Sequence, residues 1–404
     1  MSAAGDGIRR ALILPGGGAR GAYQVGVLQA VSALLPRGAR NPFGVITGTS
    51  AGAINAAVVA ARARRFEVAA RELAAVWRNF RAHHVYRTDT RTMLRSSLRW
   101  LATLVAGGLG RHNPNSLLDY SPLQTLLSRE ISFPRLAEAL RRGDLDALAV
   151  TATAYGVGRS VTFFQGRPEL VGWRRARRAG VAVELTLEHV LASAAVPLVF
   201  PPVWINGQWY GDGAVRQSAP LSAAIHLGAQ RLCVVGVRDE QPDPDPAADA
   251  RPPYPGFGEL AGYLLDSLFM DSLYADLERL TRINRMLAQL PPGTALQGPP
   301  SRLRRIDTLL FTPSHDVRKI AQRHAGELPR TVRALLRGVG ASNRGGAQLL
   351  SYLLFESGFT RELMALGYED AMARRTELEA FLFADEMGEL EAPEPLRRGL
   401  LEDT

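Results

Sequence analysis

Cysteine and lysine are almost absent from this sequence. Cys233 is the only cysteine among 404 residues, which excludes an intramolecular disulfide and a metal site built from cysteines. It lies in the apolar run 232–237, where we expect a buried strand residue rather than a nucleophile. Lys319 is the only lysine among 48 basic residues, so nearly all positive charge is arginine. We interpret this bias as genome composition.

Long apolar runs are absent as well. No stretch reaches the roughly 18 apolar residues of a membrane-spanning helix, and residues 1–10 lack the apolar core of a secretory signal. We therefore predict a cytoplasmic protein whose contact with a membrane would be peripheral, at the inner face. The net charge of +9 favours anionic surfaces. No arginine-rich run is interleaved with aromatic residues, so we do not expect a nucleic-acid partner.

The alternating pattern of an α/β protein is present. The length and the 46% hydrophobic content allow one large core or two ordinary ones. Strand, glycine loop, helix, strand and helix follow one another, an order that favours a parallel sheet covered on both faces. The segments concerned are a strand at 8–14, a helix at 22–35, a strand ending at 45–46 and a helix at 51–63.

The later segments continue this pattern and end in helices. We predict strands at 145–154, 231–237 and 306–312, hairpins around 160–164 and 205–210, and helices at 66–80, 186–195 and 259–290. Prolines predict a surface loop at 238–256, and glycines predict breaks in the C-terminal helices at 338–346 and 358. The predicted division is a catalytic domain at 8–312, a helical C-terminal region at 313–390 packed on it, and a tail at 391–404.

A Gly-x-Ser-x-Gly turn joins the second predicted strand to a helix. Gly48 and Gly52 flank Ser50, and a strand-to-helix turn of this kind needs small residues on both sides of an exposed serine hydroxyl. Ser50 would stand at a helix N-terminus, where partial positive charge stabilises a developing anion. The motif makes Ser50 a candidate nucleophile.

A glycine run, 16–21, follows the first predicted strand. Without side chains, its backbone N–H groups are open to an anion. The spacing Gly16-x-Gly18-x-x-Gly21 also satisfies a dinucleotide fingerprint, but that site needs an acidic residue about 20 positions later. No Asp or Glu occurs between Asp6 and Glu67, so only an arginine such as Arg37 or Arg40 could serve an NADP-type site. The missing Gly-Lys-Ser/Thr ending excludes a P-loop. The other use is an oxyanion hole.

The third motif, Asp212-Gly213-Ala214, follows a predicted Asn-Gly hairpin. An aspartate between glycine and small residues is often only a turn residue. A nucleophilic serine, however, needs a base within hydrogen-bonding reach. Asp212 is therefore the candidate base.

Taken in order, the three motifs resemble the patatin-like phospholipase family. Its signatures are Gly-Gly-Gly-x-Arg/Lys-Gly, Gly-x-Ser-x-Gly and Asp-Gly-Gly/Ala, and the resemblance runs from about residue 8 to 237, including 192–197 and 200–202. Residues 262–382 also resemble the C-terminal part of bacterial members. The resemblance implies a three-layer α/β/α sandwich with a mainly parallel central sheet and a helical C-terminal region. It implies hydrolysis of acyl esters, of phospholipids or lysophospholipids, without cofactor or metal.

The resemblance also implies a role for each motif residue. Ser50 would be the nucleophile and Asp212 its base, in a dyad without histidine. Ala214 stands where many members have glycine, an accepted variant. The remaining assignments are an oxyanion hole from the amides of Gly16, Gly17 and Gly18, loop ordering or contact with a lipid phosphate by Arg20 with Gly21, and the elbow glycines Gly48 and Gly52.

Three alternatives stay open. A Ser-Asp-His triad would need a histidine after Asp212, from His226, His315 or His324. The same dyad could serve a general esterase, thioesterase or acyltransferase. From a different class, the glycine loop could bind a dinucleotide.

One further segment, 91–111, mixes arginines with Trp and Leu. It contains no acidic residue, so it could lie on an anionic membrane as a cationic amphipathic helix or act as a lid. A surface helix that packs its apolar stripe on the core has the same pattern. The sequence does not predict the oligomeric state.

Overall fold

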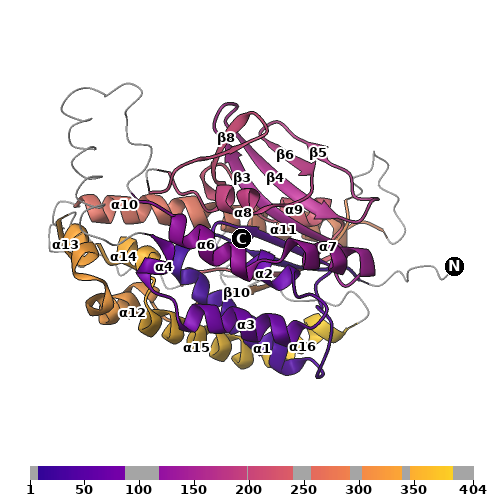
Figure 1. The fold of residues 1–404 in the computed structure, drawn as a ribbon. Helices are drawn as coiled ribbons and strands as arrows, with labels where there is room; N and C mark the ends of the chain where they lie inside the picture. Colours follow the sequence, from indigo (N-terminus) through magenta and orange to yellow (C-terminus); the bar gives the residue numbers. More distant parts are fainter. Residues whose placement is uncertain are drawn as a thin grey trace.

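The structure, a computed structural model, describes residues 8–86, 118–197, 199–239, 256–291, 303–338 and 346–384. In these ranges the chain forms a ten-stranded sheet with helices on both faces (Figure 1). The strand order is β10-β9-β1-β2-β3-β4-β6-β5, and the β7–β8 hairpin extends the sheet beside β3. The predicted α/β class with a mainly parallel central sheet is confirmed.

Five neighbouring strands are parallel and form the centre of the sheet. Each is short and buried, as expected for strands that are covered on both faces. Their carboxyl ends meet at one edge, where open α/β sheets bind ligands. They are β1 (Arg10–Leu14), β2 (Val45–Thr49), β3 (Ala147–Ala154), β9 (Arg231–Val235) and β10 (Asp307–Phe311).

Strands of mixed direction complete one side of the sheet. β4 (Arg159–Gly166) pairs with β3, and β6 (Arg178–Ala182) and β5 (Trp173–Arg174) follow it. The predicted Asn-Gly hairpin is present as β7 (Val203–Ile205) and β8 (Gln208–Asp212). Asn206 and Gly207 both have positive φ, 47° and 82°, as a two-residue hairpin turn requires.

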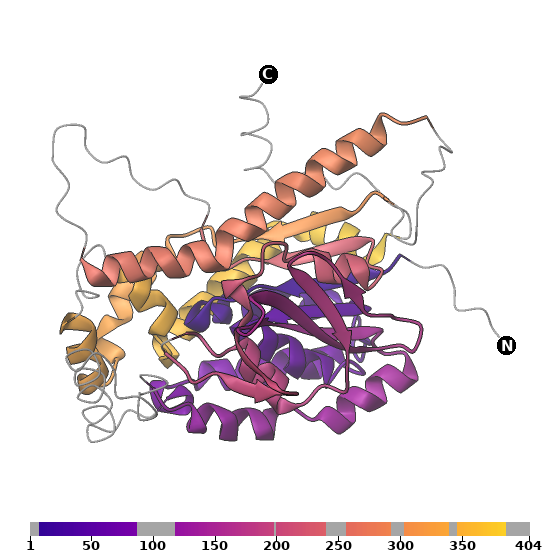
Figure 2. The same cartoon turned by 90° about the horizontal axis from the view of Figure 1, so that it is seen from above.

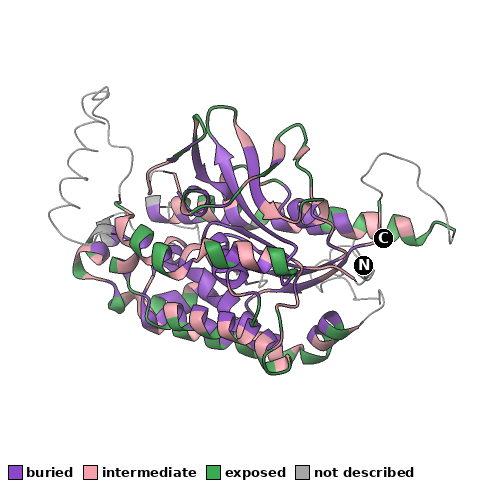
Figure 3. Ribbon diagram, turned by 45° about the vertical axis from the view of Figure 1, so that its right-hand side comes forward, coloured by how far each residue is buried: buried purple, intermediate pink, exposed green. Residues whose placement is uncertain are grey.

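Alternate side chains of the central strands point to opposite faces and build two cores. Leu12 and Leu14 of β1 belong to one core, and Ala11 and Ile13 to the other. The first core includes α1 (Ala22–Leu34), α2 (Ala51–Ala60), α3 (Phe66–Arg78) and α15 (Ser357–Ala373), and the second includes α9 (Ser222–His226) and α11 (Ser272–Ala288). Figure 3 shows the buried sheet between partly exposed helices.

The other helices connect these layers or cover their ends. They are α4 (Ala82–Val85), α6 (Ser121–Glu130), α7 (Phe133–Arg142), α8 (Leu187–Ser193), α10 (Phe257–Asp266), α12 (Val317–His324), α13 (Arg330–Gly338), α14 (Ala347–Leu353) and α16 (Arg375–Phe383). Among the helices that the structure describes, none is both long enough and apolar enough to cross a bilayer.

The C-terminal helix α15 lies along α1 at close range. A Cβ atom on Gly26 would lie 2.0 Å from the carbonyl oxygen of Met364, and one on Gly367 would lie 2.2 Å from that of Tyr23. A larger residue at either glycine would push the two helices apart. The pairing therefore attaches the end of the chain to its first helix.

Two of the element predictions differ from the structure in detail. The helix predicted at 259–290 is two helices, α10 and α11, joined by a π-helical turn at Ser267–Asp271 (Figure 2). The turn brings Phe269 against Tyr352, with ring centres 5.4 Å apart, a tertiary contact that helical periodicity does not reveal. The break predicted at Gly358 is present two residues earlier, at 354–356 between α14 and α15, and Gly358 lies in the first turn of α15.

Four sequence predictions concern segments outside the described residues. These are the amphipathic segment 91–111, the tail 391–404, nearly all of the loop 238–256 and nearly all of the break at 338–346.

Candidate active site

Ser50 lies in the sharp turn between β2 and α2. Its backbone has φ 54° and ψ −128°, a left-handed conformation that is costly for a residue other than glycine. The Ser50 N–H donates to Ser193 Oγ at 3.1 Å, and the residue is only 3% exposed. Such strain at a strand-to-helix turn is typical of a serine nucleophile.

The glycines on both sides of Ser50 are required by space. A Cβ on Gly48 would lie 2.4 Å from the carbonyl oxygen of Gly52, and a Cβ on Gly52 would lie 2.0 Å from that of Leu14. No other residue fits either position without moving the backbone. The absence of side chains at these two glycines therefore allows the turn to lie directly against β1.

The glycine loop after β1 lies beside Ser50. A Cβ on Gly16 would lie 2.9 Å from Ser50 Cβ, and Gly18 has a positive φ of 53°. In the described part of the chain, the N–H groups of Gly16 and Gly17 donate to no acceptor. Backbone donors next to a nucleophile are the chemical requirement of an oxyanion hole.

Protein atoms cover the outer side of this loop. The Cβ position of Gly17 is 2.5 Å from a side-chain carbon of Val237, and that of Gly18 is 2.4 Å from the carbonyl oxygen of Tyr352. A dinucleotide pyrophosphate needs a close approach to such glycines. The packing leaves little space for one, so the geometry does not favour that alternative.

Asp212 ends β8 next to the carboxyl end of β3. On β3, Asp212 pairs with Ala152, and the preceding residue, Thr151, pairs with Thr49 of β2. Ser50 follows Thr49 directly, so both residues of the dyad lie beside the same part of β3. Its Oδ1 accepts a hydrogen bond from the Ala214 N–H at 2.9 Å. Its Oδ2 is buried and has no hydrogen-bonding partner among the described residues. The strands therefore bring Asp212 to Ser50, 162 positions away in the sequence.

Burial gives the Asp212 carboxyl an unusual pKa. Removal from water raises the pKa from 3.8 to about 7, while the nearby Ser50 hydroxyl and the Ala214 N–H lower it by smaller amounts. The Ser50 hydroxyl is near enough for this effect, but no hydrogen bond of ordinary length joins it to Oδ2. Catalytic hydrogen bonds are often long before substrate binds. A carboxyl with a pKa near 7 is suited to act as a general base.

No histidine takes part in this arrangement within the described ranges. His226 stacks on Trp173, with ring centres 4.8 Å apart. His324 forms hydrogen bonds with Glu327 and Glu362, and His315 bonds to Ser314. None of the three forms a hydrogen bond with Asp212. The geometry favours the dyad over a triad.

An apolar cavity begins at Ser50. Helices α2, α3, α6, α10 and α14 contribute to its walls, and among its lining residues only Glu130 is charged. Aromatic and aliphatic side chains fill the lining, including Trp77, Phe80, Leu127, Phe269 and Leu353. Such a cavity excludes water and accepts a hydrocarbon chain.

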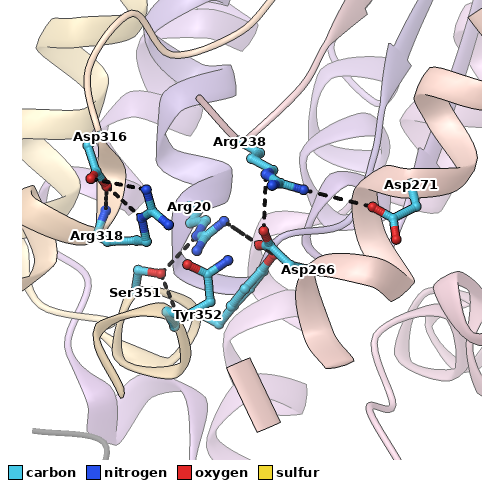
Figure 4. Close-up of polar contacts among 9 residues, drawn as sticks. Arg20, Arg238, Asp266, Asp271, Asp316, Arg318, Ser351 and Tyr352 are labelled. Atoms are coloured by element: carbon cyan, nitrogen blue, oxygen red, sulfur yellow. Dashed lines mark hydrogen bonds and ion pairs between the residues drawn. The ribbon is translucent and has the colours of Figure 1, made fainter. Parts of the chain in front are cut away.

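Arg20 holds the glycine loop to the C-terminal part of the chain (Figure 4). The side chain is 1% exposed and forms an ion pair of 3.0 Å with Asp266 on α10. Its Nε donates to Ser351 Oγ at 2.8 Å, and its guanidinium lies 3.9 Å from the ring centre of Tyr352. Gly21 follows it and would bring a Cβ to 3.3 Å from that of Ala51. These contacts favour loop ordering over contact with a lipid phosphate.

We expect Arg20→Met to destabilise the protein. Removing one partner of a buried ion pair typically costs about 3 kcal/mol, which lowers the melting temperature by roughly 3–4 °C in a chain of this size. The matched control is Arg279→Met, because Arg279 pairs with Asp276 but is 61% exposed, and exposed pairs contribute less than about 1 kcal/mol. Calorimetry measures both. Equal melting temperatures for the two variants would contradict the assigned role of Arg20.

Ser193 belongs to the site, although the sequence assigned it no role. Its hydroxyl accepts from the Ser50 N–H and donates to the carbonyl oxygen of Thr151 at 2.6 Å. It thereby joins the end of α8 to the elbow and to β3. Only its position in the segment 192–197 before Asp212 could have indicated this. Within the described ranges, no group of His, Cys, Asp or Glu side chains could hold a metal ion.

Comparisons with known proteins give the following matches. A family model described as Patatin-like phospholipase matches residues 12–225, more than half of the chain. The chain is similar to VipD from Legionella pneumophila, with 13% identity and a TM-score of 0.30 over 92% of this chain and 74% of that one. It is also similar to human GIVD cytosolic phospholipase A2 in complex with methyl gamma-linolenyl fluorophosphonate, with 14% identity and a TM-score of 0.42 over 98% of this chain. It spans 60% of the human chain. A search of curated proteins finds no match.

Proposed function

Because this chain belongs to the patatin-like phospholipase family and is a lipid acyl hydrolase, we propose that it cleaves acyl esters of phospholipids or lysophospholipids with a Ser50–Asp212 dyad. The observation that carries the proposal is the position of Ser50. It stands between a buried carboxyl with a pKa near 7 and a cavity that accepts a hydrocarbon chain.

The reaction begins with the acyl chain in the cavity and its ester carbonyl at Ser50. Ser50 Oγ attacks the carbonyl carbon while Asp212 accepts the hydroxyl proton. The carbonyl oxygen becomes an oxyanion, which the N–H groups of Gly16, Gly17 and Gly18 stabilise. Preorganised donors of this kind contribute roughly 3–4 kcal/mol each in hydrolases.

Collapse of the tetrahedral intermediate breaks the bond to the leaving alcohol. Asp212 returns its proton to the alcohol oxygen, which leaves an acyl-enzyme on Ser50. Water then enters, loses a proton to Asp212 and attacks the acyl carbonyl. Collapse of this second intermediate breaks the bond between the acyl carbon and Ser50 Oγ, Asp212 returns the proton to Oγ, and the fatty acid is released. The scheme requires neither a metal nor a nucleotide.

The test is a hydrolysis panel with the purified full chain. We expect free fatty acid from phosphatidylcholine or lysophosphatidylcholine, identified by mass spectrometry, and incorporation of one labelled oxygen atom into it from isotopically labelled water. Addition of glycerol as an acceptor distinguishes hydrolysis from acyl transfer. If the acyl chain appeared only on glycerol and not as free fatty acid, the activity would be that of an acyltransferase and not of a hydrolase. Failure to cleave any ester would refute the proposal.

A further inference from the structure

Three exposed aromatic side chains form a row across neighbouring strands. Trp204 of β7 pairs with Trp209 of β8, and their ring centres are 4.9 Å apart. The Tyr155 N–H, just after β3, donates to the carbonyl oxygen of Trp209, and the register sets the two residues opposite each other on one face. Their exposed fractions are 54%, 49% and 41% for Trp204, Trp209 and Tyr155.

The opposite face of the same hairpin is packed. Val203, Ile205 and Tyr210 are buried and belong to the larger core. A strand pair with one buried face normally presents polar side chains to water on the other face. Here the outward positions next to the turn are both tryptophan. Contiguous exposed apolar surface of this kind marks an interaction site.

The row lies at the end of the sheet that bears Ser50. β3 extends past the end of β2, and its last residues, Ala152 to Ala154, pair with β8. Trp209 and Asp212 both lie on β8, three positions apart. The negative charge of Asp212 is also near enough to raise the pKa of Tyr155, in addition to burial. The aromatic row therefore lies at the same end of the sheet as the dyad.

Exposed arginines lie at this same end of the sheet. β4 and β6 are parallel, so the turn 155–158 before β4 and the turn 175–177 before β6 lie at one end of the sheet. The segments 155–159, 174–178, 204–209 and 213–218 contain no acidic residue. None of their exposed arginines forms an ion pair with any residue that the structure describes; these are Arg174, Arg175, Arg177 and Arg216.

We propose that this surface, the aromatic rim, docks the protein on an anionic phospholipid bilayer. The rim consists of Tyr155, Trp204 and Trp209 with the four exposed arginines. Trp and Tyr prefer the level of the lipid headgroups, where one end of the side chain is apolar and the other is wet. Each arginine near an anionic membrane surface contributes about 1 kcal/mol of attraction. The positive charges on the rim are thus complementary to anionic phosphate headgroups, and they gain nothing from a neutral or cationic surface.

Docking in this way gives the proposed reaction a direction. A lipid that leaves the bilayer beside the rim arrives at the end of the sheet where Ser50 lies. The role of docking rests on the proposed function, because it supplies the substrate for that reaction. The binding itself, however, can be measured without catalysis. Binding is therefore measured on the Ser50→Ala variant, which separates the two questions.

The experiment is flotation of the full-length Ser50→Ala protein with vesicles. The vesicles contain phosphatidylcholine alone or mixed with phosphatidylglycerol. We expect binding to the mixed vesicles, weakened by high salt because the arginine contribution is screened. Adding Trp204→Ser with Trp209→Ser should reduce the partition coefficient roughly tenfold or more. Adding Arg175→Gln with Arg177→Gln should reduce it about thirtyfold, and only on anionic vesicles.

Matched controls use the opposite end of the sheet. Arg37 and Arg64 are exposed near the start of β2, and Val171 is 78% exposed after the end of β4. Arg37→Gln with Arg64→Gln, and Val171→Ser, should bind as Ser50→Ala does. Circular dichroism and melting temperatures show whether each variant is folded.

Two results would overturn the docking proposal. One is vesicle binding that is the same for folded Ser50→Ala and for the tryptophan variant, including the case in which neither protein binds. The other is a change from dimer to monomer on removal of the tryptophans without a change in vesicle binding, which would make the rim a protein interface. The wild type separates the docking proposal from the proposed function. Wild-type protein that cleaves a soluble short-chain ester but binds no vesicles would keep the proposed function and refute only the docking at the rim.

Discussion

Ser50→Ala is expected to reduce ester hydrolysis by a factor on the order of 10⁵, to near background, because no other group can form the acyl-enzyme. Labelling by a fluorophosphonate probe should disappear in the same variant. The fold should persist, since alanine retains the Cβ that the elbow already accommodates. Steady-state kinetics and mass spectrometry of the labelled protein give the two measurements.

Two serine variants make this result specific. Ser160 is buried on β4 and forms no hydrogen bond with Ser50 or Asp212 in the described part of the chain, so Ser160→Ala should keep both labelling and turnover. Ser193 supports the elbow through the Ser50 N–H. Its alanine variant should slow turnover without abolishing labelling, because the nucleophile remains. Labelling that survived Ser50→Ala would show that another residue is the nucleophile.

Asp212→Asn is expected to remove activity while it stabilises the fold. An amide cannot accept the serine proton, so kcat/KM should fall at least about a thousandfold. In the wild type the base works only when it is deprotonated. Because its pKa is about 7, kcat/KM should rise with pH up to about 7 and remain constant above it.

The stability effect follows from the direction of the same shift. The folded-state pKa of about 7 exceeds the ordinary value of 3.8, so the folded protein binds this proton more tightly than the unfolded chain. The contribution of Asp212 is thus fully present below about pH 4 and is lost as the pH rises to about 7. The loss has an upper limit of about 4 kcal/mol for three pKa units. Asparagine avoids this loss.

Melting temperatures at two pH values test this sign. Near pH 8, Asp212→Asn should melt above the wild type, and near pH 4 the difference should vanish. A variant that is less stable than the wild type near pH 8 would contradict the buried, unpaired carboxyl. Alanine variants of His226, His315 and His324 are the controls for activity. Loss of turnover in one of them, with the fold intact, would support a triad instead.

The parts of this site that the sequence predicts are those that depend on local geometry. Gly48, Ser50 and Gly52 specify their own turn, because only small residues fit beside a serine in that conformation. The Asn206-Gly207 hairpin is predictable for the same reason, since its turn needs positive φ at both residues. Apolar runs likewise predict the parallel strands, whose two faces are both covered.

The parts that the sequence does not predict depend on long-range contacts. Ser193 supports Ser50 from 143 residues away. The π turn at Ser267–Asp271 forms where Phe269 packs on Tyr352, so helical periodicity continues through a segment that the tertiary fold interrupts. The pKa of Asp212 likewise depends on burial by strands that are distant in sequence. No window of the sequence contains these neighbours.

The ion pair between Arg20 and Asp266 also sets an order of events during synthesis. Its partners are 246 residues apart, and Tyr352 and Ser351 are synthesised later still. Contacts of such long sequence separation form late in folding. On the ribosome, a nascent chain therefore exposes Ser50 long before the loop beside it can adopt its final shape. The contacts that hold the glycine loop beside Ser50 are therefore completed only after Tyr352 has been synthesised.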